Sequence, residues 1–198
     1  MALSNIKYKY DKDLPFFKNI LKNVISANDE DIKWDLINES FYSSYVFYFG
    51  GHDIPHELKH ITNPSFIKSL LDYVEISMDC KLKKLVSIEA HKQTINHEVD
   101  IHNDYDYNSK GYPNIRLVWN LNGRDVLKKG GNFCFRAEDG TILKRFPIIK
   151  NTSILFRISK KSFHSIDKVI SGQRNVIVFS FWTKSKKVSQ EEVCFYPN

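Results

Sequence analysis

Four side chains have the types and the order needed to hold a metal ion and an acidic ligand. His102 and Asp104 are two residues apart, and residues at that spacing in a β-strand point to the same face, so both could bind one ion. His164 follows the apolar run 153–158 and a short turn, and could join them as a third ligand. Two imidazoles and one carboxylate leave coordination positions open, as iron(II) requires for activating dioxygen.

Arg174 is the fourth of these side chains. It follows His164 by ten residues and opens an apolar strand predicted over residues 175–182. Strand alternation places its guanidinium on the same face as Val176 and Val178. A planar guanidinium buried inside a barrel favours a carboxylate, which it can bind through two hydrogen bonds. The sequence therefore predicts that Arg174 holds one end of an acidic cosubstrate.

In this order, the residues resemble the 2-oxoglutarate and iron(II)-dependent dioxygenases, in the branch that is similar to the prolyl 4-hydroxylases. The resemblance covers residues 86–182. It includes the strand at 115–122 with its Leu-Asn end, the Gly-Gly turn at 130–131, and the segment 147–156 that leads to the second histidine.

The resemblance implies that His102, Asp104 and His164 hold Fe(II) and that Arg174 anchors 2-oxoglutarate. It also implies that O2 is consumed, that 2-oxoglutarate is decarboxylated to succinate, and that an unactivated C–H bond is hydroxylated. The carboxylate of Asp104 implies hydroxylation and not halogenation, because halogenating relatives lack it to make room for halide.

This sequence departs from the family pattern at the tyrosine whose hydroxyl helps to bind 2-oxoglutarate in many relatives. The corresponding places hold Lys92, Gln93 and Asn120. Either Gln93 or Asn120 could donate an equivalent hydrogen bond, and the sequence leaves both possibilities open.

Candidate substrate contacts follow the first two metal ligands. Tyr105, Tyr107 and Tyr112 belong to a polar, aromatic segment that could cover the site as a lid or form an ordinary solvated loop. Arg116 could face inward and contact an acidic substrate group, or lie on the outside of the barrel. A barrel with no added recognition domain favours a small polar molecule as substrate. A prolyl-type peptide side chain is the main alternative, and a non-catalytic jelly-roll module that only binds metal is another.

A second metal motif occurs at residues 56–60, His-Glu-Leu-Lys-His, which satisfies the zinc-protease pattern H-E-x-x-H. Pro55 marks a helix start, so the motif would lie in a first turn, and Lys59 would place a positive charge beside the zinc. We therefore interpret it as a solvent-facing helix that begins with polar residues.

Composition limits the remaining possibilities. A chain of 198 residues fits one domain, and none of its apolar runs approaches the ~20 residues of a membrane helix. The three cysteines, at unrelated spacings, favour reduced thiols and a cytoplasmic location. The formal net charge of +6 comes from scattered lysines and not from a continuous basic stripe, so a nucleic-acid partner is not expected.

The predicted fold is mainly β with flanking α-helices, a double-stranded β-helix, or jelly-roll barrel. Residues 1–198 form one domain in this interpretation, with a mostly helical part at 1–84 packing on a barrel core at 85–183. Apolar spacing predicts helices that start near Asp13 and over residues 64–76. A strand is expected at 44–50, and Asp139-Gly140 predicts a hairpin between strands at 133–136 and 142–146.

Overall fold

The computed structural model describes residues 2–27, 29–39, 42–50, 53–105, 111 and 113–185. Within these residues eleven strands form one sheet, in the order β1-β9-β6-β11-β4-β3-β5-β10-β7-β8, with β2 paired to β3. All the pairings between the strands are antiparallel. The strands are β1 (Tyr8–Lys12), β2 (Asp35–Glu39), β3 (Tyr42–Tyr48), β4 (Leu82–Gln93), β5 (Val99–His102), β6 (Ile115–Asn120), β7 (Phe133–Arg136), β8 (Ile142–Phe146), β9 (Thr152–Arg157), β10 (His164–Ile166) and β11 (Arg174–Thr183).

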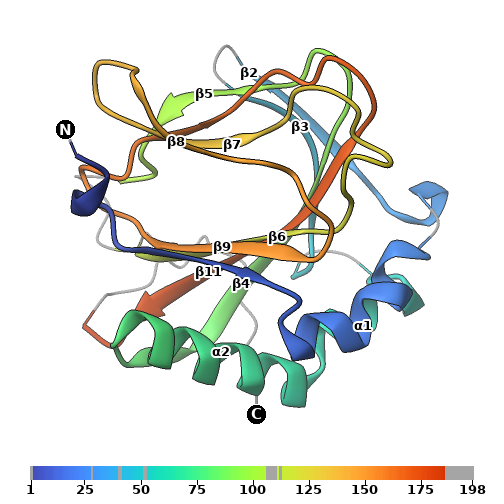
Figure 1. Ribbon diagram of the computed structural model, residues 1–198. Helices are drawn as coiled ribbons and strands as arrows, with labels where there is room; N and C mark the ends of the chain where they lie inside the picture. Colours follow the sequence, from blue (N-terminus) through green and yellow to red (C-terminus); the bar gives the residue numbers. More distant parts are fainter. Residues whose placement is uncertain are drawn as a thin grey trace.

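The sheet folds over on itself into two facing layers, and the helices cover only one of them (Figure 1). One layer contains β1, β9, β6, β11 and β4, and the other contains β5, β10, β7 and β8, with β3 pairing to both β4 and β5. This arrangement confirms the predicted jelly-roll class. The helical segments are η1 (Leu3–Asn5), α1 (Pro15–Ile25), η2 (Asp29–Asp31), η3 (His56–Thr62) and α2 (Pro64–Met78).

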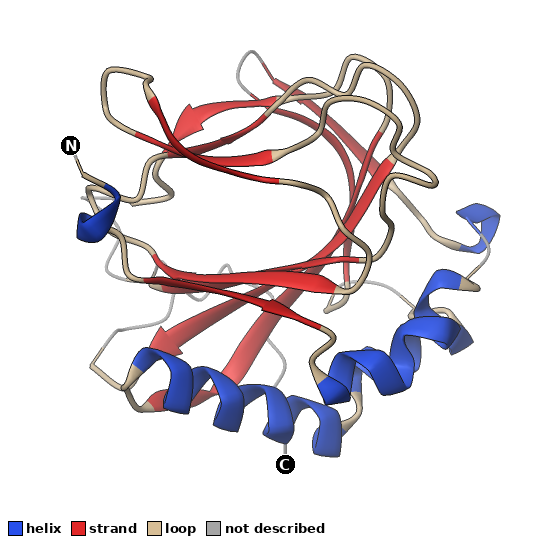
Figure 2. Ribbon diagram, viewed as in Figure 1, coloured by secondary structure: helices blue, strands red, loops and turns tan. Residues whose placement is uncertain are grey.

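Helices α1 and α2 pack on the outer face of the first layer (Figure 2). The sequence predicted both helices, and Phe66, Leu70 and Val74, the expected apolar stripe of α2, are all buried. Phe17 of α1 stacks on Trp119 of β6, with ring centroids 4.2 Å apart and planes 7° from parallel. The outer face of β6 is therefore fixed against the helices, which leaves its inner face for the site.

The second core lies between the two layers and is rich in aromatic rings. Phe133, Phe135, Phe146 and Phe156 are almost fully buried there and contact one another edge to face or tilted. The predicted hairpin between β7 and β8 is confirmed, and Gly140 adopts the positive φ of 89° that its turn requires. These rings close one part of the barrel interior, so the site occupies the remainder.

The first third of the chain is less helical than the sequence predicted. Strands β1 and β2 had been missed, and β3 runs from Tyr42 to Tyr48, where residues 44–50 had been expected. Strand β1 alternates aromatic and charged residues and pairs with β9 at the sheet edge, so its polar character hid it. Residues before position 85 thus supply strands to the sheet as well as helices. None of the helices in the described part of the chain is both long and apolar enough to cross a membrane.

Candidate metal and cosubstrate site

Two neighbouring, paired strands and one turn bring the three predicted metal ligands together. His102 is the last residue of β5 and His164 the first residue of β10, and the two lie directly opposite each other in the antiparallel pairing. Asp104 lies beyond the strand end with a positive φ of 53°. His102 and Asp104 do lie together, but the expectation that strand alternation would place them on one face was wrong, because Asp104 is not part of the strand. A left-handed turn, which aspartate tolerates better than most residues, directs the carboxylate back toward the histidines.

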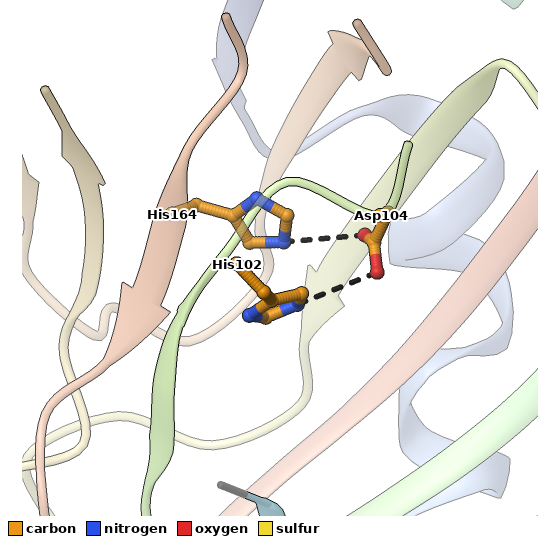
Figure 3. A group of neighbouring side chains, drawn as sticks. All are labelled: His102, Asp104 and His164. Atoms are coloured by element: carbon orange, nitrogen blue, oxygen red, sulfur yellow. Dashed lines mark ion pairs between the residues drawn. The ribbon is translucent and has the colours of Figure 1, made fainter. Parts of the chain in front are cut away.

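The three side chains point toward one another (Figure 3). The Nε2 atom of His102 lies 3.3 Å from Oδ1 of Asp104, and the Nε2 atom of His164 lies 3.2 Å from Oδ2. One ligand atom from each residue lies within 4.8 Å of the others. In the described part of the chain, this group of histidine and acidic ligands has three members, which leaves further coordination positions for exogenous ligands.

Backbone carbonyls orient both imidazoles. Nδ1 of His102 lies 2.8 Å from the Asp100 oxygen, and Nδ1 of His164 lies 2.9 Å from the Ser162 oxygen. A carbonyl accepts only from a protonated nitrogen, so in the neutral rings Nε2 is the unprotonated atom that faces the group. Metal-binding histidines are commonly held in this way. The donor set and its tautomers therefore fit a divalent transition metal such as iron(II).

The electrostatics around Asp104 keep its carboxylate ionised. Burial opposes its charge, but Arg116, whose Nη1 donates to Oδ2 at 2.6 Å, and the two histidines hold the pKa of Asp104 well below its usual range. Burial also lowers the pKa of His164, against the attraction of Asp104. At His102 burial acts in the same direction, but the neighbouring carboxylate outweighs it and raises the pKa. Asp104 is therefore a charged ligand whether or not a metal is bound.

Arg174 opens β11 as predicted and is only 3% exposed. Its Nη1 donates to Oε1 of Gln93 at 2.7 Å, and its Nε has no hydrogen-bond partner among the described residues. Burial lowers its pKa from 12.5 to about 10. A buried guanidinium whose direct partner is a neutral amide is well suited to bind an anion.

One cavity of about 70 Å³ joins the histidines to Arg174. Val176 and Val178 line it beside Arg174, which confirms the face predicted for this strand. The cavity is lined by Tyr42, His91, Gln93, Val99, His102, Arg116, Val118, Phe133, His164, Ile166, Arg174, Val176 and Val178.

Tyr42 is a cavity residue that sequence reasoning missed. Its hydroxyl lies 2.7 Å from Nδ1 of His91, and Nε2 of His91 lies 3.0 Å from a carboxylate oxygen of Glu89. Burial is the main cause that raises the pKa of Tyr42, so its phenol stays protonated. Tyr42 comes from β3, far along the chain from every motif, and pairs with Val99 of β5. No local sequence signal could have identified it.

The structure separates the two residues proposed to replace the missing tyrosine. Gln93 lines the cavity and contacts Arg174. Asn120 is buried on β6, but its amide donates to Oγ1 of Thr152 and it does not line the cavity.

The remaining candidate contacts are placed as follows. Arg116 faces inward and lines the cavity. Tyr105 is partly buried against the inner core, and its backbone N–H donates to the Asn103 side chain. Tyr107 and Tyr112 lie outside the described residues.

The H-E-x-x-H sequence does not form a second metal centre with other described residues. It lies in η3, a 3-10 helix, where His56 and His60 are exposed and Leu58 and Ile61 are buried. The two histidines join no group of metal-binding side chains in the described part of the chain. The prediction of a solvent-facing helix is therefore correct for the two histidines, although the segment is a 3-10 helix and not an α-helix.

Comparison with known proteins gave matches in structure alone. No protein-family model matches the sequence, and no curated protein matches it. A prolyl-4-hydroxylase from Pseudomonas putida superposes with a TM-score of 0.70 at 11% identity, covering 91% of this chain and 94% of that one. The viral collagen prolyl hydroxylase of Paramecium bursaria Chlorella virus-1, solved with 2-oxoglutarate, gives 0.61 at 20% identity, covering 88% and 94%.

A third similar structure carries a bound peptide. It is a Trichoplax adhaerens prolyl hydroxylase in complex with a fragment of the oxygen degradation domain of hypoxia inducible factor, with a TM-score of 0.67 at 10% identity, covering 91% of this chain and 85% of that one. At these identities the comparisons establish the fold. The chain has the jelly-roll fold of prolyl-hydroxylase-type 2-oxoglutarate and iron(II) oxygenases.

Proposed function

We propose that this protein is an iron(II) dioxygenase that couples oxidative decarboxylation of 2-oxoglutarate to hydroxylation of a C–H bond. The observation that carries the proposal is that His102 and His164, which form one group with Asp104, line the same cavity as the buried Arg174. A metal group alone would also suit a binding module. A buried cation at the other end of the same cavity gives a reason for a dicarboxylate.

The charges around the cavity support this choice of cosubstrate. Arg116 and Arg174 are positive and Asp104 is negative. Glu89, hydrogen-bonded to the cavity residue His91, also stays ionised. Burial opposes its charge, but the hydrogen bond with His91 and the charge of Arg116 lower its pKa. These four charges cancel. A divalent metal therefore leaves two positive charges to be neutralised, and a 2-oxo dicarboxylate supplies two negative ones.

The chain's own residues have distinct roles in this proposal. His102, Asp104 and His164 bind the metal, and Arg174 with Gln93 orients the far carboxylate of 2-oxoglutarate. When bound, iron would activate dioxygen, which is the oxidant for both the cosubstrate and the substrate C–H bond. The apolar wall formed by Val118, Val176 and Val178 excludes water from the space between the metal group and Arg174.

The test is anaerobic spectroscopy of the iron(II)-loaded protein during titration with 2-oxoglutarate. A weak visible charge-transfer band should appear in the wild type and be lost in His102→Ala. His56→Ala is the matched control, because it removes an exposed histidine from the rival zinc motif and should leave the band unchanged. A band that is absent from the iron-loaded wild type would favour the non-catalytic metal-binding module instead.

For the substrate, we propose a small polar molecule, since the cavity is small and is lined by residues of both layers of the barrel. A peptidyl prolyl-type side chain is the second candidate. It is favoured by the fold shared with prolyl hydroxylases, one of which was solved with a peptide. Succinate release measured with pools of free amino acids and with proline-containing peptides distinguishes the two candidates.

We also propose a reducing, cytoplasmic location, in which iron stays ferrous. Neither Cys80 nor Cys134 forms a disulfide with another described residue. Labelling of the thiols in freshly lysed cells tests this proposal, and extensive oxidation of both would contradict it.

A further inference from the structure

Arg116 is a second arginine in the cavity, and it contacts the metal group through Asp104. It lies on the inner face of β6, between Ser180 of β11 and Phe156 of β9 in the sheet register. Its side chain is 19% exposed, and its Nη1 donates to Oδ2 of Asp104 at 2.6 Å. The same Oδ2 lies 3.2 Å from Nε2 of His164. A fixed positive charge therefore lies directly beside the place where a divalent cation would bind.

Such a position is electrostatically unfavourable unless a further anion is present. Once a metal binds, Asp104 shares its charge between the ion and Arg116. Asp104 is only 8% exposed, so solvent screens the repulsion between the two cations weakly. Glu89, which also interacts with Arg116, is already hydrogen-bonded to His91. Arg116 contacts a metal ligand and also lines the cavity, so a carboxylate of a ligand bound at the metal end would add negative charge directly beside it.

We propose that Arg116 binds the carboxylate of the 2-oxo acid that lies nearest the metal, while also holding Asp104 in its metal-binding orientation. The cavity then has one arginine for each end of the cosubstrate, Arg174 for the far carboxylate and Arg116 for the near one. This inference rests on the proposed function and replaces the expectation that Arg116 recognises an acidic substrate. The primary substrate then needs no negative charge, because the cosubstrate neutralises the site.

Two ligands separate the roles of the two arginines. 2-Oxoglutarate has a carboxylate at both ends, whereas 2-oxobutanoate keeps the 2-oxo acid end and lacks the far carboxylate. Binding of each is measured anaerobically by the charge-transfer band on protein saturated with iron(II), so that a change in metal affinity does not enter the result. The variants are Arg116→Gln, Arg116→Lys and Arg174→Gln. Arg145→Gln is the control, because it removes the same charge from an exposed side chain of β8.

Arg116→Gln should weaken both ligands by a similar factor, about tenfold to a hundredfold, the usual effect of losing a hydrogen bond to a charged group. Arg174→Gln should weaken 2-oxoglutarate to about the affinity of 2-oxobutanoate and leave 2-oxobutanoate itself unchanged. Arg116→Lys, which keeps the charge but loses the planar fork, should fall between wild type and Arg116→Gln. If Arg116→Gln does not fold, the ligand affinities of Arg116→Lys test the inference instead.

Three results would overturn the inference. Ligand affinities in both Arg116 variants within twofold of Arg145→Gln would show that Arg116 does not bind the cosubstrate. Weakening of 2-oxoglutarate alone would place Arg116 at the far carboxylate. Unchanged cosubstrate binding with a raised substrate KM would return Arg116 to substrate recognition. Failure of the proposed function looks different, because the wild-type protein itself would then give no band with either ligand.

Discussion

Replacing Arg174 with methionine should weaken 2-oxoglutarate binding to about the affinity of 2-oxobutanoate, without a large loss of stability in the ligand-free protein. Arg174 is buried, its direct hydrogen-bond partner is the neutral Gln93, and its Nε is unsatisfied among the described residues. The burial that lowers its pKa from 12.5 to about 10 corresponds to about 3 kcal/mol, at about 1.4 kcal/mol per pKa unit. The folded protein carries this cost until an anion binds.

The Arg174→Met variant removes that cost but leaves Oε1 of Gln93 without its donor. An unsatisfied buried acceptor costs about 1–3 kcal/mol. The two effects nearly cancel, so the free energy of unfolding of the single variant should lie within about 2 kcal/mol of the wild-type value. The double variant Arg174→Met/Gln93→Leu removes the acceptor as well, but it also removes the hydrogen bond that Nε2 of Gln93 donates to the Ser43 oxygen at 3.3 Å. It should therefore be at most about 2 kcal/mol more stable than the single variant.

Urea denaturation of the metal-loaded protein, with and without 2-oxoglutarate, measures both quantities. At a hundred times its wild-type Kd, 2-oxoglutarate should stabilise the wild type by about 2.7 kcal/mol. The same concentration should stabilise either variant much less. A loss of about 4 kcal/mol or more in the free energy of unfolding, which is exceptional for one substitution, would refute the reasoning for Arg174→Met. Full stabilisation of this variant by 2-oxoglutarate would refute it as well.

Three further predictions concern the metal group and the framework that positions it. The carboxylate of Asp104 raises the pKa of His102 above 6.5 despite burial. In a titration with Co(II) in place of iron(II), protons should therefore begin to compete for His102 above pH 6.5, and the affinity for Co(II) should fall further as the pH drops. A Co(II) affinity that is constant between about pH 8 and 6 would contradict this. Trp119→Leu, which removes the stack on Phe17, should lower the free energy of unfolding by about 2–4 kcal/mol in denaturant titration. Gly172→Ala should cost at least about 1–3 kcal/mol by the same measurement, because Gly172 has a φ of +88° and an added Cβ would lie 2.1 Å from the Val126 oxygen; wild-type stability would show that the loop relaxes freely.

The parts of the fold that the sequence predicted are those where local pattern and tertiary environment agree. Helix α2 was predicted because Phe66, Leu70 and Val74 recur at helical spacing on a face that the sheet does bury. The hairpin at Asp139-Gly140 was predicted because a turn with positive φ selects glycine. Strand β1 was missed because it is held by pairing with β9, and a pairing partner 140 or more residues away leaves no local pattern.

The residues of the candidate site likewise fall into those that the sequence predicted and those that depend on the folded structure. His102, Asp104, His164 and Arg174 were found because their chemistry and order are informative without coordinates, and the structure brings the first three together as one group. Tyr42 and the ion pair between Arg116 and Asp104 depend on register. Tyr42 reaches the cavity because β3 pairs with β5, and Arg116 turns inward because Ser180 and Phe156 fix its face of β6.

Register also explains why one arginine of the cavity could be assigned and the other could not. Arg174 opens an apolar strand, so alternation with Val176 and Val178 predicts its direction whatever the rest of the fold does. Arg116 lies one residue into a strand of almost continuously buried residues, where alternation gives no direction. Its partner, Asp104, lies beyond the strand end and itself has a left-handed backbone conformation, which no sequence pattern predicts. The contact between them is therefore a property of the folded sheet, and the charge that Arg116 adds beside the metal enters the chemistry only once the structure is known.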